Sequence, residues 1–291
     1  MKITKAVIPA AGLGTRVLPA SKAVPKEMLN IVDKPDLQYL VEEAAASGIT
    51  DILIITNRGK EVIENHFDYS FELEAGLKKN PAKQKIYDQV HAVADLANIY
   101  YVRQKETNGL AHALLKAEAF AAGEPFAVLY GDDVIIGDDP ATAQLCRAYE
   151  KYGKCTVGVN ECPREEIHKY CSLDVTPLEE RVMDVHRIIE KPEEDEIMSL
   201  FAILGRNVLS PEIFDYIRLT PPNPKSGEVY LTDAFNTMGA EGKLTAVNFT
   251  GKRYDMGDKF GIMEANCEVA LNHPEIGAKF RAYLKELAKT L

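Results

Sequence analysis

Short apolar runs alternate with amphipathic stretches through the first half of the chain. Runs rich in Ile, Val and Tyr predict a first strand that begins at Ile3 and three further strands over residues 52–56, 98–103 and 126–131. The stretches between them predict helices over residues 37–47, 60–66 and 111–122. This alternation predicts right-handed crossovers and a mostly parallel sheet with helices on both faces.

The second half of the chain has a different pattern. Short strands are predicted over residues 155–160, 173–176, 184–189 and 200–204, with shorter helical connections, which is typical of a mixed sheet. Residues 71–95 carry many charges, and Pro81 divides them into two predicted helices that leave the sheet. Further helices are predicted over residues 259–271 and 276–291. No repeat or Pro/Ser-rich linker divides the chain, so we expect one domain over residues 1–291.

The first predicted strand leads into a loop suited to bind phosphate. Gly12 and Gly14 allow the backbone to turn sharply and to present N–H groups to an anion. Arg16 and Lys26 add positive charge to the same loop. It is not a Walker motif, because Thr15-Arg16 follows Gly14 where that motif has Lys-Ser/Thr. It also lacks the third glycine of a dinucleotide-binding fingerprint.

Composition excludes several classes of protein. The 291 residues are 46% apolar and 27% charged, as in a globular protein, and the formal net charge of −10 argues against nucleic acid or an anionic membrane as partner. Five cysteines without a Cys-x-x-Cys motif indicate reduced thiols rather than disulfides or a zinc site. No apolar run approaches the ~18 residues of a membrane span, and no signal sequence is evident, so we expect a cytoplasmic protein.

Several motifs, in fixed order, resemble one enzyme family. The chain reads Ala11-Gly12-Leu13-Gly14-Thr15-Arg16, then Pro25-Lys26-Glu27-Met28-Leu29, then Lys34-Pro35-Asp36-Leu37-Gln38-Tyr39. This order is similar to the signature of sugar-1-phosphate nucleotidylyltransferases and, more narrowly, of the bacterial uridylyltransferases that use UTP and glucose 1-phosphate. The resemblance implies a three-layer α/β/α, Rossmann-like nucleotidyltransferase fold with a mostly parallel mixed central sheet. The N-terminal half would bind the nucleotide and the C-terminal half, with the C-terminal helices, the sugar phosphate.

The implied reaction converts UTP and glucose 1-phosphate into UDP-glucose and pyrophosphate, with Mg²⁺ as cofactor. The sugar phosphate is already a dianionic nucleophile, so positioning and electrostatics carry the catalysis without a general base. The resemblance assigns Arg16 to the leaving pyrophosphate, and Lys26 and Lys191 to the reacting phosphates. Helical excursions contribute to subunit contacts in this family, so we expect a homodimer or a higher homo-oligomer.

The nucleotide-binding elements of the family map onto two parts of the chain. They are the glycine loop and a Gln-to-Gly segment, with residues Ala10, Ala11, Gly12, Gly14, Thr15, Gln104 and Gly109. A Gln just beyond a strand can pair a pyrimidine edge with both its donor and its acceptor. A glycine at a helix start lets a base approach the backbone. His112, close by, is interpreted as a packing residue.

Asp132 and Asp255 are the candidate metal ligands. Carboxylates at the carboxyl end of a central strand suit a hard divalent cation, with phosphate oxygens and water completing the octahedron. Asp132 matches the metal-binding Asp of the family, whereas Asp133 is equally well explained as a cap for a helix near residue 139. Asp255, in Asp-Met-Gly, resembles a second ligand of the wider superfamily.

The sugar-phosphate side is assigned to Cys171, Glu190 and Lys191. The Glu-Lys-Pro segment ends a predicted strand, and its two charged side chains should point to opposite faces if both residues stay extended. Cys171 stands where relatives usually have glycine, which would be strained if φ is positive. We expect its thiol to turn away from the sugar and Cys171→Gly to lower KM for glucose 1-phosphate. Tyr230 replaces a usual Gln and is given no role.

Two other functions remain open at this point. A thymidylyltransferase acting on dTTP and a hexose 1-phosphate has similar loop motifs, and the two nucleotides must be compared directly. A non-catalytic regulator that binds nucleotide sugars is the alternative from another class. The presence of Arg16, Lys26, Asp132 and Lys191 together argues against it.

Overall fold

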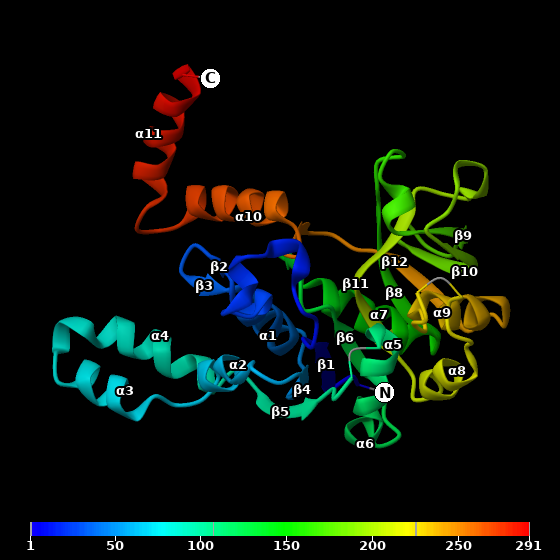
Figure 1. The fold of residues 1–291 in the computed structure, drawn as a ribbon, viewed down its shortest axis with the longest axis horizontal. Coiled ribbons are helices and arrows are strands. Elements are labelled where there is room, and N and C mark those ends of the chain that lie inside the picture. The colour runs from blue at the N-terminus through cyan, green and yellow to red at the C-terminus, as the bar shows by residue number, and fades with distance from the viewer. Residues whose placement is uncertain (1, 107, 225, 291) are drawn as a thin grey trace.

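A nine-stranded sheet forms the centre of the molecule (Figure 1). The computed structural model describes residues 2–106, 108–224 and 226–290. Across the sheet the strands are β5 (Asn98–Arg103), β4 (Asp51–Thr56), β1 (Lys5–Pro9), β6 (Phe126–Leu129), β11 (Phe201–Leu209), β8 (Cys155–Glu161), β12 (Leu244–Asn248), β10 (Val182–Glu190) and β9 (Cys171–Pro177). All of them run in one direction except β11 and β10, which confirms the mostly parallel mixed sheet.

Side chains alternate between two hydrophobic cores along the strands. In β1, Ala6 and Ile8 pack into one core while Val7 packs into the other. β4 behaves in the same way, with Ile52 and Ile54 on one side. Because successive strand residues point to opposite faces, each face of the sheet has its own core and its own layer of helices. The predicted three-layer α/β/α architecture is thereby confirmed.

The helices divide between these two faces. The first core includes side chains of α1 (Asp36–Ala46), α2 (Glu61–His66), α7 (Ala141–Tyr152) and α10 (Lys259–Asn272). The second core includes side chains of α5 (Gly109–Leu114), α6 (Glu118–Ala121), α8 (Ile213–Leu219) and α9 (Leu231–Ala240). Two small ribbons complete the structure: β2 (Asn30–Ile31) with β3 (Lys34–Pro35), and β7 (Asp133–Ile136) with β13 (Lys252–Asp255).

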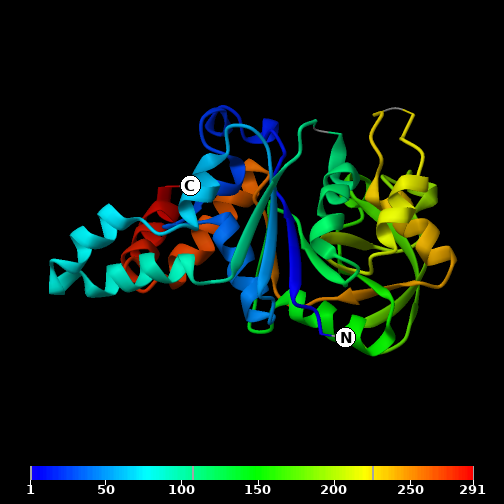
Figure 2. The same cartoon turned by 90° about the horizontal axis from the view of Figure 1, so that it is seen from below.

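Two helical segments project from the sheet (Figures 1 and 2). They are the pair α3 (Phe71–Lys78) and α4 (Gln84–Ala94), and the C-terminal helix α11 (Gly277–Leu287) after α10. A 3₁₀ turn beginning at Pro81 separates α3 from α4, so the division predicted at this proline is confirmed. Within the described ranges, no helix combines the length and the apolar character needed to cross a membrane.

Two predicted elements differ from the structure at their ends. The helix predicted over residues 111–122 begins at Gly109, changes to a 3₁₀ turn over Leu115–Ala117 and ends at Ala122, which is left-handed with φ 52°. The strand predicted over residues 126–131 ends at Leu129. After it, Asp133 N donates to Tyr130 O, so residues 130–133 form a turn that carries Asp132 out of the sheet.

Candidate active site

The glycine loop leaves the sheet where parallel strands end together. β1 lies between β4 and β6, so the carboxyl ends of all three meet at one edge, which is where open α/β sheets bind ligands. Gly14 has φ 65° and ψ 33° and precedes a 3₁₀ turn over Thr15–Val17. Its hydrogen faces the Ser21 side chain so closely that a Cβ would lie 3.0 Å from Ser21 Cβ. Glycine is therefore required at this turn by both conformation and space.

Two adjoining hollows lie above this edge of the sheet. The larger, about 440 Å³, is lined by Ala11, Gly12, Leu13, Thr15, Lys26, Gln104, Gly109 and Asp132, among others. The smaller, about 240 Å³, is lined by residues that include Cys171, Glu190, Tyr230 and Thr232. Leu110, Tyr130 and Glu228 line both hollows. The two are therefore neighbouring parts of one cleft, whose lining comes from both halves of the chain.

Cations and carboxylates meet beside the larger hollow, whose lining includes Lys26 and Asp132. Lys26 Nζ lies 2.5 Å from Asp132 Oδ2, and Arg16 lies 3.4 Å from the same oxygen. The other end of the Arg16 guanidinium lies 3.8 Å from Asp255. Met256 N donates to Asp132 O at 2.8 Å, which fixes the two carboxylate-bearing loops to each other. The structure thus brings together four of the predicted residues, from loops far apart in the sequence.

Gly257 belongs to this cluster, although the sequence pattern gave it no separate role. Its N–H donates to Asp255 Oδ1 at 2.8 Å. A Cβ at this position would lie 2.6 Å from the Arg16 guanidinium and 2.8 Å from Asp132. Only glycine leaves room for the charged groups to approach one another here.

Lys26 and Asp132 each stabilise the charged form of the other. Burial by itself would raise the pKa of Asp132, but the Lys26 ammonium, its hydrogen bond and Arg16 outweigh burial and hold that pKa below its ordinary value. Burial likewise opposes the charged form of Lys26, while Asp132 raises the Lys26 pKa above its ordinary value. At neutral pH the cluster therefore contains a carboxylate at Asp132 and an ammonium at Lys26.

Asp132 and Asp255 fit a hard divalent cation as a pair. Among the residues that the structure describes, no group of three or more His, Cys, Asp or Glu side chains could hold a metal. Each of the two carboxylates keeps 23% of its side-chain surface exposed. Magnesium sites of this kind use one or two carboxylates together with phosphate oxygens of the substrate. The donor set therefore suits a cation that binds together with a phosphate ligand.

Asp133 has a different role from the helix cap considered from the sequence. It is the first residue of β7, is 5% exposed and pairs with Arg253, whose guanidinium nitrogens lie 2.5 and 2.6 Å from Oδ1. The alternative interpretation of Asp133 as a cap is therefore wrong. The buried pair joins β7 to β13, the strand that ends at Asp255.

Gln104 and Gly109 lie together at the far end of the larger hollow. Gln104 is buried, and its amide nitrogen contacts Gly109 O at 3.3 Å and His112 Nδ1 at 3.0 Å. Gly109 has φ 83°, and a Cβ at this position would lie only 3.2 Å from the Glu228 carboxylate. His112 therefore orients Gln104, and Glu228 is a wall residue that the sequence pattern did not single out.

The smaller hollow is built around the ends of β9 and β10. Cys171 and Glu190 are paired across these antiparallel strands, and burial raises the pKa of Glu190. Lys191 follows with φ 50°, and its N–H donates to Tyr170 O at 2.7 Å. The condition under which Glu190 and Lys191 would point to opposite faces, that both stay extended, is therefore not met, because the chain turns at Lys191. The Lys191 ammonium lies 5.7 Å from the centre of the Tyr230 ring, a contact missed from the sequence.

Cys171 has no positive φ, so cysteine is not strained at this position. It is 2% exposed, and its sulfur accepts a hydrogen bond from Ile203 N at 3.4 Å. Burial raises the pKa of the thiol to about 12. The side chain thus packs toward β11.

Of the predicted nucleotide-binding residues, Gly14 is absent from the lining of the larger hollow, and so is Ala10, which lies beneath the cleft. Ala10 is fully buried, its N–H donates to Ile55 O at 2.8 Å, and its carbonyl accepts from Lys60 at 2.5 Å. Its backbone groups are thus already paired inside the protein. Lys60 itself, a buried cation under the loop, was not singled out from the sequence.

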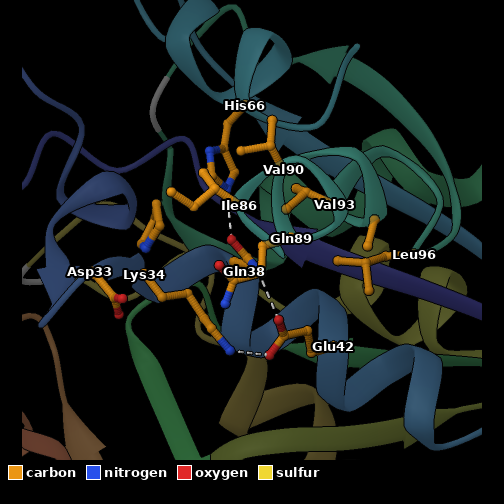
Figure 3. A pocket seen from close by; sticks show the side chains of 12 residues that line it. Asp33, Lys34, Gln38, Glu42, His66, Ile86, Gln89, Val90, Val93 and Leu96 are labelled. Atoms are coloured by element: carbon orange, nitrogen blue, oxygen red, sulfur yellow. Dashed lines mark hydrogen bonds and ion pairs between the residues drawn. The ribbon is translucent and has the colours of Figure 1, made fainter. Parts of the chain in front are cut away.

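A separate hollow of about 480 Å³ lies between α1, α2 and α4 (Figure 3). Its polar side chains satisfy one another: Lys34 pairs with Glu42 at 2.7 Å, Gln38 donates to Glu42 at 2.8 Å, and His66 contacts Gln38 at 3.0 Å. The remaining wall is largely apolar, with Ile86, Val90, Val93 and Leu96. Its lining contains none of the predicted site residues.

Comparisons with known proteins agree with this geometry. Residues 5–272 match the model of the family described as "Nucleotidyl transferase". A UTP–glucose-1-phosphate uridylyltransferase of Staphylococcus epidermidis is 47% identical over 286 residues, covering 98% of this chain and 99% of the relative.

Solved structures give the same result. A UTP-bound UGPase from Acinetobacter baumannii has a TM-score of 0.88 and 33% identity, over 98% of this chain and 99% of the other. A UDP-glucose pyrophosphorylase complexed with UDP-glucose has a TM-score of 0.83 and 38% identity, over 92% and 98%. The chain therefore belongs to the nucleotidyl transferase family.

Proposed function

We propose that this chain transfers UMP from UTP to glucose 1-phosphate, giving UDP-glucose and pyrophosphate. Relatives that carry this activity in their names align along nearly the whole chain. The observation that carries the proposal is the pair of adjoining hollows, which share Leu110, Tyr130 and Glu228, together with Lys26 and Asp132 in the lining of the larger hollow and Arg16 beside Asp132.

The larger hollow would hold the nucleotide. Gln104 and Gly109 offer an amide and a backbone to the edge of uracil, and Ala11, Gly12, Gly14 and Thr15 supply the loop around the phosphates. The smaller hollow would hold the sugar phosphate, with Glu190 toward the hydroxyls and the backbone of Cys171 at its edge. Both ligands would then bind to a single domain. The nucleotide would lie over its N-terminal half and the sugar over its C-terminal half.

The cations would carry most of the catalysis. The two substrates are polyanions, so the barrier lies in bringing their phosphates together and in stabilising charge on the leaving group. We assign Arg16, whose side chain is largely exposed, to the departing pyrophosphate, and Lys26, held by Asp132, to the reacting α-phosphate. Lys191, at the border of the smaller hollow, is assigned to the phosphate of the sugar.

A divalent cation, proposed to be Mg²⁺, would be held by Asp132 and Asp255. When bound, it would neutralise charge on the phosphates of both substrates. Arg16 contacts both carboxylates, so its guanidinium is placed to keep them oriented and to release one of them to the cation. No general base is required, because the sugar phosphate is already ionised at neutral pH.

The experiment that tests this function is pyrophosphate release from UTP with glucose 1-phosphate and Mg²⁺, with UDP-glucose identified as the product. Parallel reactions with dTTP give the ratio of kcat/KM for the two nucleotides. We expect turnover that favours UTP. A higher kcat/KM with dTTP would indicate a thymidylyltransferase, and tight binding of UDP-glucose without turnover would indicate a regulator.

We further propose that the chain forms a homodimer or a higher homo-oligomer and acts in the cytoplasm. Exposed apolar side chains such as Phe71 and Leu73 on α3 support self-association, and free thiols at all five cysteines are consistent with a reducing compartment. Light scattering of the purified chain would test the first proposal. A monomer at micromolar concentration would refute it.

A further inference from the structure

The loop between β4 and α2, residues 57–60, lies directly under the glycine loop. Lys60 Nζ donates to Ala10 O at 2.5 Å, to Gly12 O at 2.8 Å and to Glu27 Oε2 at 2.8 Å. An ammonium has three donors, and all three are used here. The Lys60 side chain is only 7% exposed, so this is a buried, fully bonded cation rather than a surface charge.

These bonds fix the direction in which the loop presents its amides. The only cis peptide among the described residues precedes Pro19, so the peptides after Ala10 and Gly12 are trans. In a trans peptide the C=O and the following N–H point in opposite directions. With both carbonyls drawn toward Lys60, the N–H groups of Ala11 and Leu13 point away from it, and both residues line the larger hollow. Neither N–H has an acceptor among the described residues.

The same ammonium also connects the glycine loop to the catalytic lysine. Glu27 is fully buried and follows Lys26 directly in the 3₁₀ turn Lys26–Met28. Burial lowers the pKa of Lys60 and raises that of Glu27, and their mutual attraction and hydrogen bond oppose both shifts. Asn57 adds a further tie, because its side chain donates to Ala11 O at 2.6 Å.

We propose that Lys60 is a positioning residue for the nucleotide: it holds the glycine loop so that the N–H groups of Ala11 and Leu13 face the phosphates of UTP, and through Glu27 it fixes Lys26. This inference rests on the proposed function for the identity of the nucleotide. Lys60 itself touches no substrate, since its three donors are occupied inside the protein.

The test compares Lys60→Met with Lys5→Met in the full chain. Lys5 stands at the opposite end of β1 and has the same kinds of partner, Ala121 O at 3.2 Å and Glu124 Oε1 at 2.8 Å. We expect Lys60→Met to raise the Kd for UTP, measured calorimetrically without sugar phosphate, by about tenfold or more. KM for glucose 1-phosphate should change less than about twofold, and Lys5→Met should leave both constants unchanged.

Two further variants separate positioning from stability. Lys60→Met leaves the Glu27 carboxylate buried without a partner, which destabilises the fold. The double variant Lys60→Met/Glu27→Gln should recover Tm while UTP binding stays weak. Asn57→Ala, which leaves the buried ion pair intact, should weaken UTP binding by about two- to fivefold.

Several results would overturn the proposal. One is a wild-type Kd for UTP in folded Lys60→Met, or in the double variant if the single variant does not fold. Another is an equal loss of UTP binding in Lys5→Met, which would indicate general destabilisation. A wild-type chain that binds no UTP would overturn the proposed function together with this inference.

Discussion

The two ends of the cleft differ in how a lysine is held: Lys60 is buried and fully hydrogen-bonded, whereas Lys191 is exposed. Under the end proposed to bind the nucleotide, here called the nucleotide side, Lys60 is buried, and its three hydrogen-bonding partners connect it to two loops. On the sugar side, Lys191 is exposed, turns the chain with φ 50° and forms no ion pair with any described residue. Its ammonium lies over the Tyr230 ring, 5.7 Å from the ring centre. The nucleotide side is thus held by buried charge, and the sugar side by backbone pairing and one aromatic contact.

This difference has consequences for how each side responds to substitution. A change under the glycine loop removes bonds that stabilise the fold as well as those that orient the site, so stability and nucleotide binding should fall together. A change at an exposed cation removes no buried interaction, so ligand binding should fall while stability stays constant. The same difference makes the sugar side the easier place to alter specificity.

The largest effect is expected at Asp132, which lines the larger hollow. Asp132→Asn should keep the fold and lower kcat by at least ~10²-fold, because it removes a major electrostatic contribution at the reacting phosphates. EDTA should abolish the activity of the wild type. Steady-state kinetics and circular dichroism check the two parts. The matched control is Asp138→Asn, which is exposed and lies two residues beyond the end of β7, and which should be neutral.

A folded Asp132→Asn protein with near-normal turnover would contradict the assignment of Asp132 as a metal ligand. Activity that survives EDTA would contradict the proposal that catalysis requires a metal ion.

The next largest effect separates two cations by the step that each one serves. Lys191→Ala should raise KM for glucose 1-phosphate by about tenfold, since a charge-assisted contact to phosphate is lost, with KM for UTP and Tm little changed. Arg16→Ala should mainly lower kcat, because its assigned partner is the leaving group. Both variants are measured with each substrate varied in turn. A Lys191→Ala defect confined to UTP would reverse the assignment.

A smaller effect is expected at Tyr230, whose ring lies under the Lys191 ammonium. Tyr230→Leu should raise KM for glucose 1-phosphate by about two- to fivefold, the size of a partly exposed cation–π contact of ~0.5–1 kcal/mol. Tyr230→Phe keeps the ring and should behave as the wild type. Equal defects in both variants would show that the hydroxyl, not the ring, is what matters.

Much of this molecule follows from local sequence pattern, and the exceptions share a cause. The strands beginning at Lys5, Asp51 and Asn98 appear where their apolar runs predict them. The first two are buried on both faces of the parallel sheet, whereas the third is a largely exposed edge strand whose Ile, Tyr and Val residues favour extended structure. β12 and β13 were not predicted. They are only five and four residues long, and their pairing with distant strands decides their structure.

The site shows the same division between local and distant information. The loop motif identifies Gly14, Arg16 and Lys26, which are close in the sequence. It does not reveal Lys60 or Gly257, because their importance comes from contacts with Gly12 and with Arg16 across the fold. A Gly-Lys-Glu segment after a strand gives no signal of a buried lysine. The Glu-Lys-Pro segment does not show whether Lys191 stays extended, and the turn at this residue comes with a backbone hydrogen bond to Tyr170.

The smallest effect on catalysis is expected at Cys171, where the structure changes the expected sign of a substitution. An unstrained strand residue gains nothing from glycine, so Cys171→Gly should no longer lower KM for glucose 1-phosphate, and the change should stay under about twofold. Stability should fall by ~1–2 kcal/mol, because a buried thiol packed against β11 is lost and glycine is less favourable in a strand. Thermal unfolding and kinetics of Cys171→Gly and Cys171→Ala measure the two effects. A several-fold lower KM in Cys171→Gly alone would show that the Cβ, and not the core packing, limits sugar binding.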